Sequence, residues 1–331
     1  MDDREPKHLA RVVLGVDVGG TKITASAVDT HGNLLGRIQI STDISSPQAT
    51  LKSIQNTVEQ AISRSGLSRS DIQAVGLGIP GLIDPGSGIG IASVNLGWRD
   101  VPVKAWLEER LGLPCHIEND VRAAAFGEAR YGAGRGLDNM IFLIIGTGIM
   151  AVVIQGSRIY RGSNGLAGEI GHAIIKRDSP QCKCGAHGCF EALATGPAIA
   201  ARATQKVLEG RASQLASYSG KDVPSLTAEH VFEAAAQGDD VALETIHEVA
   251  EDVAYLIQFL ALAYDPQVIV LGGGVSQAGA LFLHPVFRVL ERMAEERWVF
   301  HRVYTSTLVQ ASRLGADIGV LGAAALAAQA V

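Results

Sequence analysis

The pattern of hydrophobic and polar positions predicts two α/β halves that each contain a glycine-rich hairpin. Apolar runs separated by turn residues are typical of strands, and in the first half they are Val12–Asp17, Ile23–Val28, Leu34–Ile40 and Ala74–Ile79. In the second half, Met140–Ile145 and Ile149–Ile154 flank the residues GTG in the same strand, turn, strand order. The likeness suggests an internal repeat with a period of about 130 residues. A pair of unrelated glycine-rich hairpins is the alternative.

Apolar residues at helical spacing predict the main helices. One stripe runs from Ser46, a suitable N-cap, to Gly66, which ends it. A longer stripe consists of Leu243, Ile246, Val249, Val253, Leu256, Leu260 and Ala263, and it ends near Asp265. Small residues in Gly315–Ala330 indicate a closely packed helix whose uncharged part is too short to span a bilayer.

The order of these elements predicts an α/β protein with two lobes. We expect residues 1–118 to form the N-terminal lobe, completed by the C-terminal helix 315–331. Residues 119–314 then form a larger C-terminal lobe that carries a cysteine-rich loop.

Composition narrows the class of protein. The chain has 331 residues, of which 47% are hydrophobic, so it can bury a large core. Its net charge of −6 argues against non-specific binding to nucleic acid or to an anionic membrane. The charged start MDDREPKHLA lacks the apolar segment of a signal peptide, and four cysteines fit a reducing compartment. We therefore expect a cytoplasmic protein.

Three glycine-rich turns offer backbone amides and hydroxyls to phosphate groups. In DVGGTK, the lysine adds a positive charge, and the aspartate can hold Mg²⁺ directly or through water. The turn GTG repeats this arrangement, and GGG follows the predicted strand Val268–Leu271. A type I′ hairpin turn with a surface lysine is the alternative for DVGGTK. The candidate nucleotide-binding residues are Asp17, Gly19, Gly20, Thr21, Lys22, Gly146, Thr147, Gly148, Gly272, Gly273 and Gly274.

None of these turns is a Walker A motif, and no G-x-G-x-x-G follows the first strand. The chain is therefore neither a P-loop enzyme nor an evident dinucleotide-binding enzyme.

The residues IEND mark a candidate catalytic acid. Asn119 fits a helix N-cap, and Asp120 falls in the first turn, where the helix dipole favours its ionised form. An ionised carboxylate at a helix start can accept a proton from a hydroxyl group. Simple helix capping is the alternative.

The segment CKCGAHGCFE is a candidate zinc site. Cys182, Cys184 and Cys189, together with His172 upstream, make a closed tetrahedral set of the structural type. His187 is a rival fourth ligand, and three reduced thiols in a turn are the alternative. A fixed loop would also aim two flanking carboxylates, Glu169 and Glu191, which suit a polyol ligand.

The chain resembles the ROK family of repressors, open reading frames and sugar kinases. The resemblance rests on DVGGTK, GIPGLIDP, NLGW, ENDVRAAAFGEARYGAG, GTGI, GLAGEIGH, CKCGAHGCFE and DPQVIVLGGG, which occur in family order over nearly the whole chain. It implies the actin-like ATPase (ribonuclease H-like) fold, with two α/β lobes around a cleft. It also implies a homodimer or a homotetramer.

The resemblance also implies roles for particular residues. Asp120 resembles the catalytic base for ATP- and Mg²⁺-dependent phosphorylation of the 6-hydroxyl of a hexose. The residues that resemble sugar ligands are Asn95, Asn119, Asp120, Glu169, His172 and Glu191. The residues that resemble structural Zn²⁺ ligands are His172, Cys182, Cys184 and Cys189. The stretch NLGWRDVPV is most similar to family members that act on glucose, whereas N-acetylmannosamine, N-acetylglucosamine, mannose and fructose stay open as substrates.

One departure from the family pattern concerns the second glycine turn. Met150 and Ala151 stand where family kinases commonly have small residues, so a methionine side chain near the phosphate turn could crowd the nucleotide. A sugar-binding protein with weak catalysis is therefore a second hypothesis. A sugar-responsive regulator is a third, but such proteins carry a helix-turn-helix domain, and only about ten residues precede the first predicted strand.

Overall fold

The computed structural model describes residues 12–177, 179–218 and 226–330. The prediction about the charged N-terminal segment lies outside these residues. The chain divides into two compact units: unit 1 comprises residues 1–137 and 312–331, and unit 2 comprises residues 138–311. The predicted boundary at 118/119 is therefore too early, because helix α3 (Asp120–Tyr131) packs on helix α11 (Ile318–Gln329) within unit 1.

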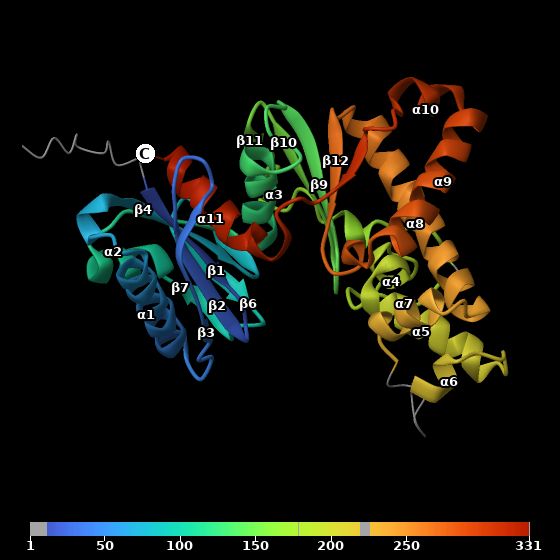
Figure 1. Cartoon of the computed structure of the whole chain (residues 1–331), viewed down its shortest axis with the longest axis horizontal. Coiled ribbons are helices and arrows are strands. Elements are labelled where there is room, and N and C mark those ends of the chain that lie inside the picture. The colour runs from blue at the N-terminus through green and yellow to red at the C-terminus, as the bar shows by residue number, and fades with distance from the viewer. Residues whose placement is uncertain (1–11, 178, 219–225, 331) are drawn as a thin grey trace, which may run out of the picture. The chain divides into compact units, whose positions relative to one another are not determined.

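Unit 1 is built on a five-stranded sheet, and four of its strands, β1 to β4, are labelled in Figure 1. The strand order is β3-β2-β1-β4-β8. Strand β2 pairs antiparallel with both β1 and β3, whereas β4 pairs in parallel with β1 and with β8. The bounds are β1 Val12–Val18, β2 Lys22–Val28, β3 Leu34–Ser41, β4 Ile72–Ile79 and β8 Cys115–Asn119. The first four agree with the apolar runs to within two residues at each end.

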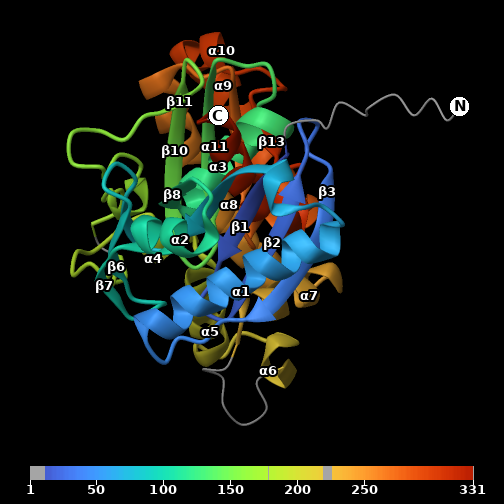
Figure 2. The ribbon, with the colours of Figure 1, turned by 90° about the vertical axis from the view of Figure 1, so that its left-hand side faces the viewer.

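Helices cover both faces of this sheet. On one face lie α1 (Pro47–Ser65), which crosses the sheet in Figure 2, and α2 (Val103–Leu111). The start and end of α1 confirm the sequence prediction: Ser46 accepts a hydrogen bond from the Ala49 amide, and Gly66 ends the helix at a φ of 74°. The other face is covered by α3 and α11. The short 3₁₀ turns of this unit are η1 (Arg69–Asp71) and η5 (Gly315–Asp317).

The small residues predicted at the C-terminus allow α11 to touch the strands backbone to backbone. A Cβ atom on Gly15 would lie 2.0 Å from the Val320 carbonyl oxygen, and one on Gly76 would lie 1.8 Å from that of Ala323. Either glycine could be replaced only if the helix moved away. Among the described residues, no helix combines the length and the apolar character needed to cross a bilayer.

A small antiparallel sheet in unit 1 was not predicted from the sequence. Its strands are β5 (Leu82–Asp84), β6 (Ile89–Ser93) and β7 (Trp98–Val101). Each strand is too short to give a clear alternation of apolar and polar residues. The motifs GIPGLIDP and NLGW lie in and around this sheet.

Unit 2 repeats the sheet topology of unit 1. Its strand order is β11-β10-β9-β12-β13, again with an antiparallel hairpin on one side and parallel strands on the other. The bounds are β9 Asn139–Ile145, β10 Ile149–Gln155, β11 Arg158–Ile159, β12 Val268–Gly272 and β13 Val309–Ala311. The internal repeat suspected from the two glycine hairpins is therefore a repeat of the fold.

The core of unit 2 lies between its sheet and a set of helices, all of which come after β11 in the chain. The bounds are η2 Ile170–His172, α4 Glu191–Ala194, α5 Gly196–Leu208, α6 Leu215–Tyr218, α7 Ala228–Ala236, α8 Asp240–Tyr264, η4 Ser276–Ala278, α9 Ala280–Glu296 and α10 Trp298–Val303. The predicted stripe along α8 is buried except at its two ends, where Leu243 and Ala263 are exposed. Their neighbours Val241 and Ala261 are buried in their place.

Candidate functional site

The first glycine turn joins β1 to β2 in unit 1. The Gly19 amide donates to the Lys22 carbonyl at 2.9 Å, so it helps to close the turn. Neither Gly19 nor Gly20 has a positive φ, which excludes the type I′ turn considered above. Glycine is needed at position 20 for a different reason: a Cβ atom there would lie 3.0 Å from the carbonyl oxygen of Asn95. The turn therefore lies against the loop that carries Asn95.

Two carboxyl groups lie near this turn. Burial and, to a smaller extent, the negative charge of Asp120 raise the pKa of Asp17 to about 6, although Lys22 acts to lower it. Burial also raises the pKa of Asp120, although hydrogen bonds from Val121 and Asn119 act in the opposite direction. Burial therefore opposes the ionised form of Asp120 that the helix start was expected to favour, and desolvation is the larger effect.

Asp120 is held at the start of α3 by its neighbours. Its Oδ1 accepts hydrogen bonds from the Val121 amide at 2.9 Å and from Asn119 Nδ2 at 3.0 Å. Asn119 caps the helix through Oδ1, which accepts from the amides of Val121 and Arg122. Its Nδ2 also donates to the Gly81 carbonyl at 3.1 Å. The Asn119 amide thus makes four hydrogen bonds, which is its full capacity, and a sugar hydroxyl would have to replace one of them.

The second glycine turn joins β9 to β10 and opens onto a cavity of about 780 Å³ within unit 2. As in the first turn, the leading glycine closes the turn, because the Gly146 amide donates to the Gly148 carbonyl. The cavity is large enough for a nucleotide. It is lined by Gly146, Thr147, Gly196, Pro197, Ala200, Leu226, Thr227, Ala228, Glu229, Phe232, Glu233, Gly274, Val275, Gln277 and Ala278.

The three consecutive glycines that begin with the last residue of β12, Gly272–Gly274, have different roles. A Cβ atom on Gly272 would lie 2.4 Å from the ring of Phe142, and Gly273 has a φ of 88°. These two positions serve packing and backbone geometry. Gly274 alone lines the cavity. Of this triplet, only Gly274 is therefore placed to touch a nucleotide in unit 2.

Sequence reasoning missed the helix starts that complete the cavity. The N-termini of α5 and α7 both line it, and Thr195 and Thr227 cap them by accepting hydrogen bonds from backbone amides. The signal was present as threonine N-caps in TGP and TAEH. What was missing was the link to the glycine turn, which the Gly196 amide makes by donating to the Gly146 carbonyl at 2.9 Å.

Met150 does not line the cavity. Its methyl group lies 3.5 Å from the position that a Cβ atom on Gly168 would occupy, so it packs against the segment before Glu169. In this position, the Met150 side chain does not crowd a nucleotide bound in the cavity.

The cysteine-rich loop brings the four predicted metal ligands together. The ligand atoms of His172, Cys182, Cys184 and Cys189 all lie within 4.8 Å of one another. His172 Nδ1 is 3.6 Å from Cys182 Sγ, and the Sγ atoms of Cys184 and Cys189 are 3.7 Å apart. Tetrahedral zinc with Zn–S bonds of about 2.3 Å requires ligand atoms about 3.8 Å apart. The donor set therefore fits zinc, and the rival His187 instead contacts the Ser179 carbonyl.

Glu191 connects this loop to the second glycine turn. One carboxylate oxygen accepts from the Ile149 amide at 3.4 Å, and the other lies 4.0 Å from Cys182 Sγ. A Cβ atom on Gly148 would approach the Glu191 carboxylate to 3.0 Å, so the glycine leaves room for it. Because Nδ1 of His172 faces the cysteines, Nε2 is the nitrogen left for another ligand. Glu169 is exposed beside the same 3₁₀ turn.

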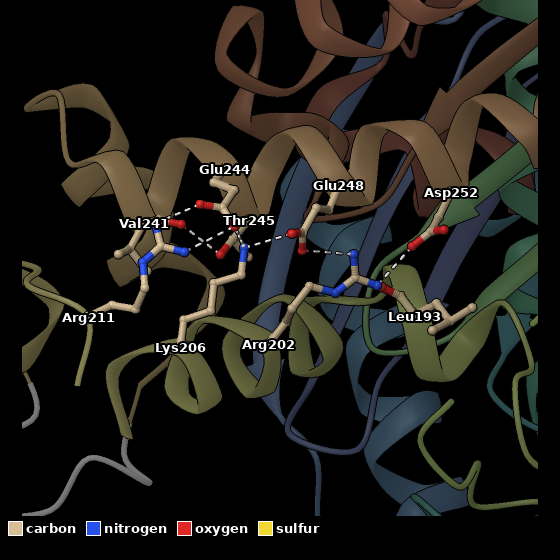
Figure 3. A network of polar contacts seen from close by, with 9 residues as sticks. All are labelled: Leu193, Arg202, Lys206, Arg211, Val241, Glu244, Thr245, Glu248 and Asp252. Atoms are coloured by element: carbon tan, nitrogen blue, oxygen red, sulfur yellow. Dashed lines mark hydrogen bonds and ion pairs between the residues drawn. The ribbon is translucent and has the colours of Figure 1, made fainter. Parts of the chain in front are cut away.

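A ladder of ion pairs fixes α5, which lines the cavity, on α8 (Figure 3). Arg202 contacts Asp252 at 2.8 Å and also donates to the Leu193 carbonyl. Further along, Lys206 lies between Glu244 and Glu248, at 2.8 and 2.9 Å. The ladder ends at Arg211, which contacts Glu244 at 2.7 Å, and Thr245 donates to the Val241 carbonyl beside it. These contacts attach the middle and the C-terminal part of α5 to α8.

The two sheets of matching topology, each with a glycine hairpin, define an actin-like ATPase of the sugar-kinase type. A family model described as the ROK family matches residues 13–330. The chain belongs to the ROK family.

Three glucokinases that this chain resembles support the same grouping. A glucokinase of Halalkalibacterium halodurans is 38% identical over 94% of this chain and 93% of its own length. A glucokinase of Streptomyces coelicolor is 35% identical over 96% of this chain and 97% of its own. The crystal structure of a ROK family glucokinase from Streptomyces griseus, in complex with glucose and AMPPNP, has a TM-score of 0.75 at 35% identity. It covers 96% of this chain and 99% of that one.

Proposed function

We propose that this protein is an ATP-dependent hexose kinase that phosphorylates the 6-hydroxyl of glucose. The observation that carries the proposal is the placement of the buried Asp120 carboxyl at the start of α3, beside Asp17 and the first glycine turn. The glucokinase relatives favour glucose as the acceptor. Mannose, fructose, N-acetylglucosamine and N-acetylmannosamine are the alternative acceptors.

Asp120 accepts the proton of the attacking hydroxyl. Its two described hydrogen bonds both go to Oδ1, so Oδ2 is the oxygen offered to the sugar. The raised pKa of this carboxyl makes it a better base than an exposed aspartate. Proton transfer to a carboxylate is still expected late, after the phosphoryl group has largely left ATP, as in a loose transition state. Positioning of the hydroxyl then supplies much of the rate.

Asp17, Lys22 and the two glycine turns hold the triphosphate. Asp17 and Asp120 raise each other's cost of ionisation, so their site favours a divalent cation. Mg²⁺ bound there would neutralise charge that develops on the phosphates. In unit 1, Gly20 and Thr21 follow the amide that closes the turn, which leaves their amides for phosphate oxygens. In unit 2, Thr147 and Gly274 line the cavity, which takes the nucleoside.

The sugar is bound by Asn95, Glu169, His172 and Glu191. Carboxylate, amide and imidazole groups supply directional hydrogen bonds to hydroxyls, and Asn95 lies beside the first glycine turn. Asn119 contributes mainly by orienting Asp120, because its amide already makes four hydrogen bonds.

Zinc held by His172, Cys182, Cys184 and Cys189 serves a structural role. Three thiolates and one imidazole complete a tetrahedral set and leave no position for a reacting water. The ion would fix the loop and, through the contact of Cys182 with Glu191, the position of a sugar ligand.

The protein works as a homodimer or a homotetramer in the cytoplasm. Support for self-association comes from apolar side chains along the outer side of α8, where Tyr255, Phe259 and Leu262 are all about half exposed. The four cysteines are free thiols, as expected in a reducing compartment. Light scattering after size-exclusion chromatography measures the number of subunits.

The kinase activity is tested with a coupled assay for ADP across a panel of hexoses. Glucose is expected to give the highest kcat/KM. Asp120→Asn is expected to keep glucose affinity within a few-fold and to lower kcat by at least about 10³-fold, because the base is lost while Asn119 can still cap α3. Substantial turnover by this variant would remove Asp120 from the role of base. No turnover of any hexose by the wild type would leave the second candidate.

That second candidate is a sugar-binding protein with weak catalysis, which the replacement at Met150 suggested. The position of Met150 outside the cavity lining favours the kinase. ATP binding without sugar turnover, measured by calorimetry and the coupled assay together, would favour the weak binder.

A further inference from the structure

The carboxylate of Glu128 lies where the chain passes between the two units. Glu128 is on α3 and is completely buried. Its Oε2 accepts from the Ala133 amide at 2.8 Å. Its Oε1 accepts from the Ser312 hydroxyl at 2.5 Å and from the amides of Arg313 and Leu314 at 3.0 and 3.3 Å. One side chain thus joins three stretches of unit 1.

Two of these stretches are the only connections between the units. The chain passes from unit 1 to unit 2 after Leu137 and returns at Ser312. Residues 132–137, the outgoing connection, follow α3 directly, and residues 312–317, the returning connection, lead into α11. The residues on the unit 1 side of both crossings are therefore tied to the same carboxylate.

The local sequence is adapted to this contact. A Cβ atom on Gly132 would lie 1.9 Å from Glu128 Oε2, so any other residue there would displace the carboxylate. The amides of Gly132 and Gly134 donate to the Glu128 backbone carbonyl at 3.1 and 3.0 Å. The outgoing connection is therefore wrapped around Glu128 through both its main chain and its side chain.

We propose that Glu128 is a positioning residue that anchors both connections to α3 and so fixes their unit 1 ends relative to Asp120. The inference rests on the proposed kinase function for its catalytic consequence. Asp120 is the first residue of α3, eight residues and about 12 Å before Glu128 on a continuous helix. The helix that presents the base is thus also the fixed end of both connections.

Substitution by glutamine tests the anchor without changing its size. A carboxylate can accept on both sides, whereas an amide has a single oxygen and a donating nitrogen. If the oxygen faces Ser312, the nitrogen faces the Ala133 amide, and two donors then meet in a buried site. Glu128→Gln should therefore loosen the outgoing connection first. Ser312→Ala removes one donor only and should have a smaller effect of the same kind.

Asp239 offers a matched control. It is also a buried carboxylate, and it accepts from the Ser213 hydroxyl and from the amides of Gln214 and Ala242. It lies in unit 2 and caps α8, remote in sequence from both connections. Asp239→Asn should lower thermal stability but leave both connections between the units intact.

The experiment combines hydrogen exchange, nucleotide binding and kinetics on the full-length protein. For Glu128→Gln we expect at least tenfold faster exchange in residues 132–137 and 312–317, and kcat lower by about tenfold or more. The Kd for ATP measured without sugar should change less than kcat, because the cavity proposed for the nucleoside lies wholly in unit 2. Asp239→Asn should show none of the changes in exchange at the connections.

Several outcomes would overturn the proposal. Unchanged exchange in Glu128→Gln, or in Ser312→Ala if the first variant does not fold, means that the carboxylate does not anchor the connections. Faster exchange with an unchanged kcat means that the anchor does not serve catalysis. An equal loss of kcat in Asp239→Asn means a general loss of stability. If the wild type phosphorylates no hexose, the proposed function fails, while the exchange measurement still decides whether Glu128 anchors the connections.

Discussion

The contact between Gly319 and Asp17 predicts that a single methyl group on α11 will impair catalysis. A Cβ atom at position 319 would lie 2.4 Å from Asp17 Cγ and 2.6 and 2.7 Å from its carboxylate oxygens. Ordinary contacts begin near 3.4 Å. The carboxylate, the helix or both must therefore move by about 1 Å in Gly319→Ala.

Withdrawal of the helix would open the close backbone contacts that α11 makes with β1 at Gly15 and with β4 at Gly76. The Asp17 side chain is consequently the part that yields. A displacement of about 1 Å in the group proposed to hold Mg²⁺ is enough to lower kcat by about 10²-fold. Overpacking of this kind also lowers the free energy of unfolding by about 1–3 kcal/mol.

The assay measures kcat with glucose at increasing Mg²⁺ concentration, alongside thermal unfolding. Gly76→Ala is the control, since a Cβ atom there meets the backbone of the same helix at Ala323. It should lose at least as much stability but keep the wild-type dependence on Mg²⁺. If Gly319→Ala has the wild-type kcat at saturating Mg²⁺, the contact does not position Asp17, and the reasoning is wrong.

Three further predictions concern charge and metal. The pKa of Asp17 is raised from 3.8 to about 6 in the folded protein, so its contribution to stability is present below pH 4 and is lost as the pH rises through 6. The free energy of unfolding of Asp17→Asn should therefore exceed that of the wild type at pH 7 by up to about 3 kcal/mol, with no difference near pH 4; equal melting temperatures at pH 7 would contradict this. In the ladder, Arg202→Ala should lower the free energy of unfolding by about 2–3 kcal/mol and Arg211→Ala by clearly less, because Arg202 is the more buried and also holds the Leu193 carbonyl; chemical denaturation should separate them, and equal effects would refute the argument. Removal of zinc by a chelator should lower the melting temperature and raise KM for glucose more than KM for ATP, and a metal-free protein with full activity would exclude the structural role of zinc.

Much of the local structure followed from the sequence because its signals are local. The helix bounded by Ser46 and Gly66 needed only a capping hydroxyl and a residue that tolerates positive φ. The four metal ligands were predicted from their spacing, since a loop of this length can bring three thiols together whatever surrounds it. The small sheet β5–β7 gave no comparable signal, because its strands are too short for a pattern to repeat.

The roles of individual glycines depended on the tertiary structure. Gly19, Gly272 and Gly274 look alike in the sequence, but one closes a turn, one makes room for Phe142, and one lines a cavity. Which role applies depends on atoms from distant parts of the chain. The same is true of the Asp120 pKa, which the helix start lowers and burial raises.

The succession of strands and helices, the paired hairpins and the metal-ligand set were predictable because they depend on neighbours along the chain. The packing of the C-terminal helix against β1 and the Asp17 carboxylate, and the hydrogen bonds of Glu128 to Ala133 and Ser312, are visible only in the folded molecule. Such contacts join residues as many as 300 positions apart, and the gain from each one exists only after the whole unit has folded around it.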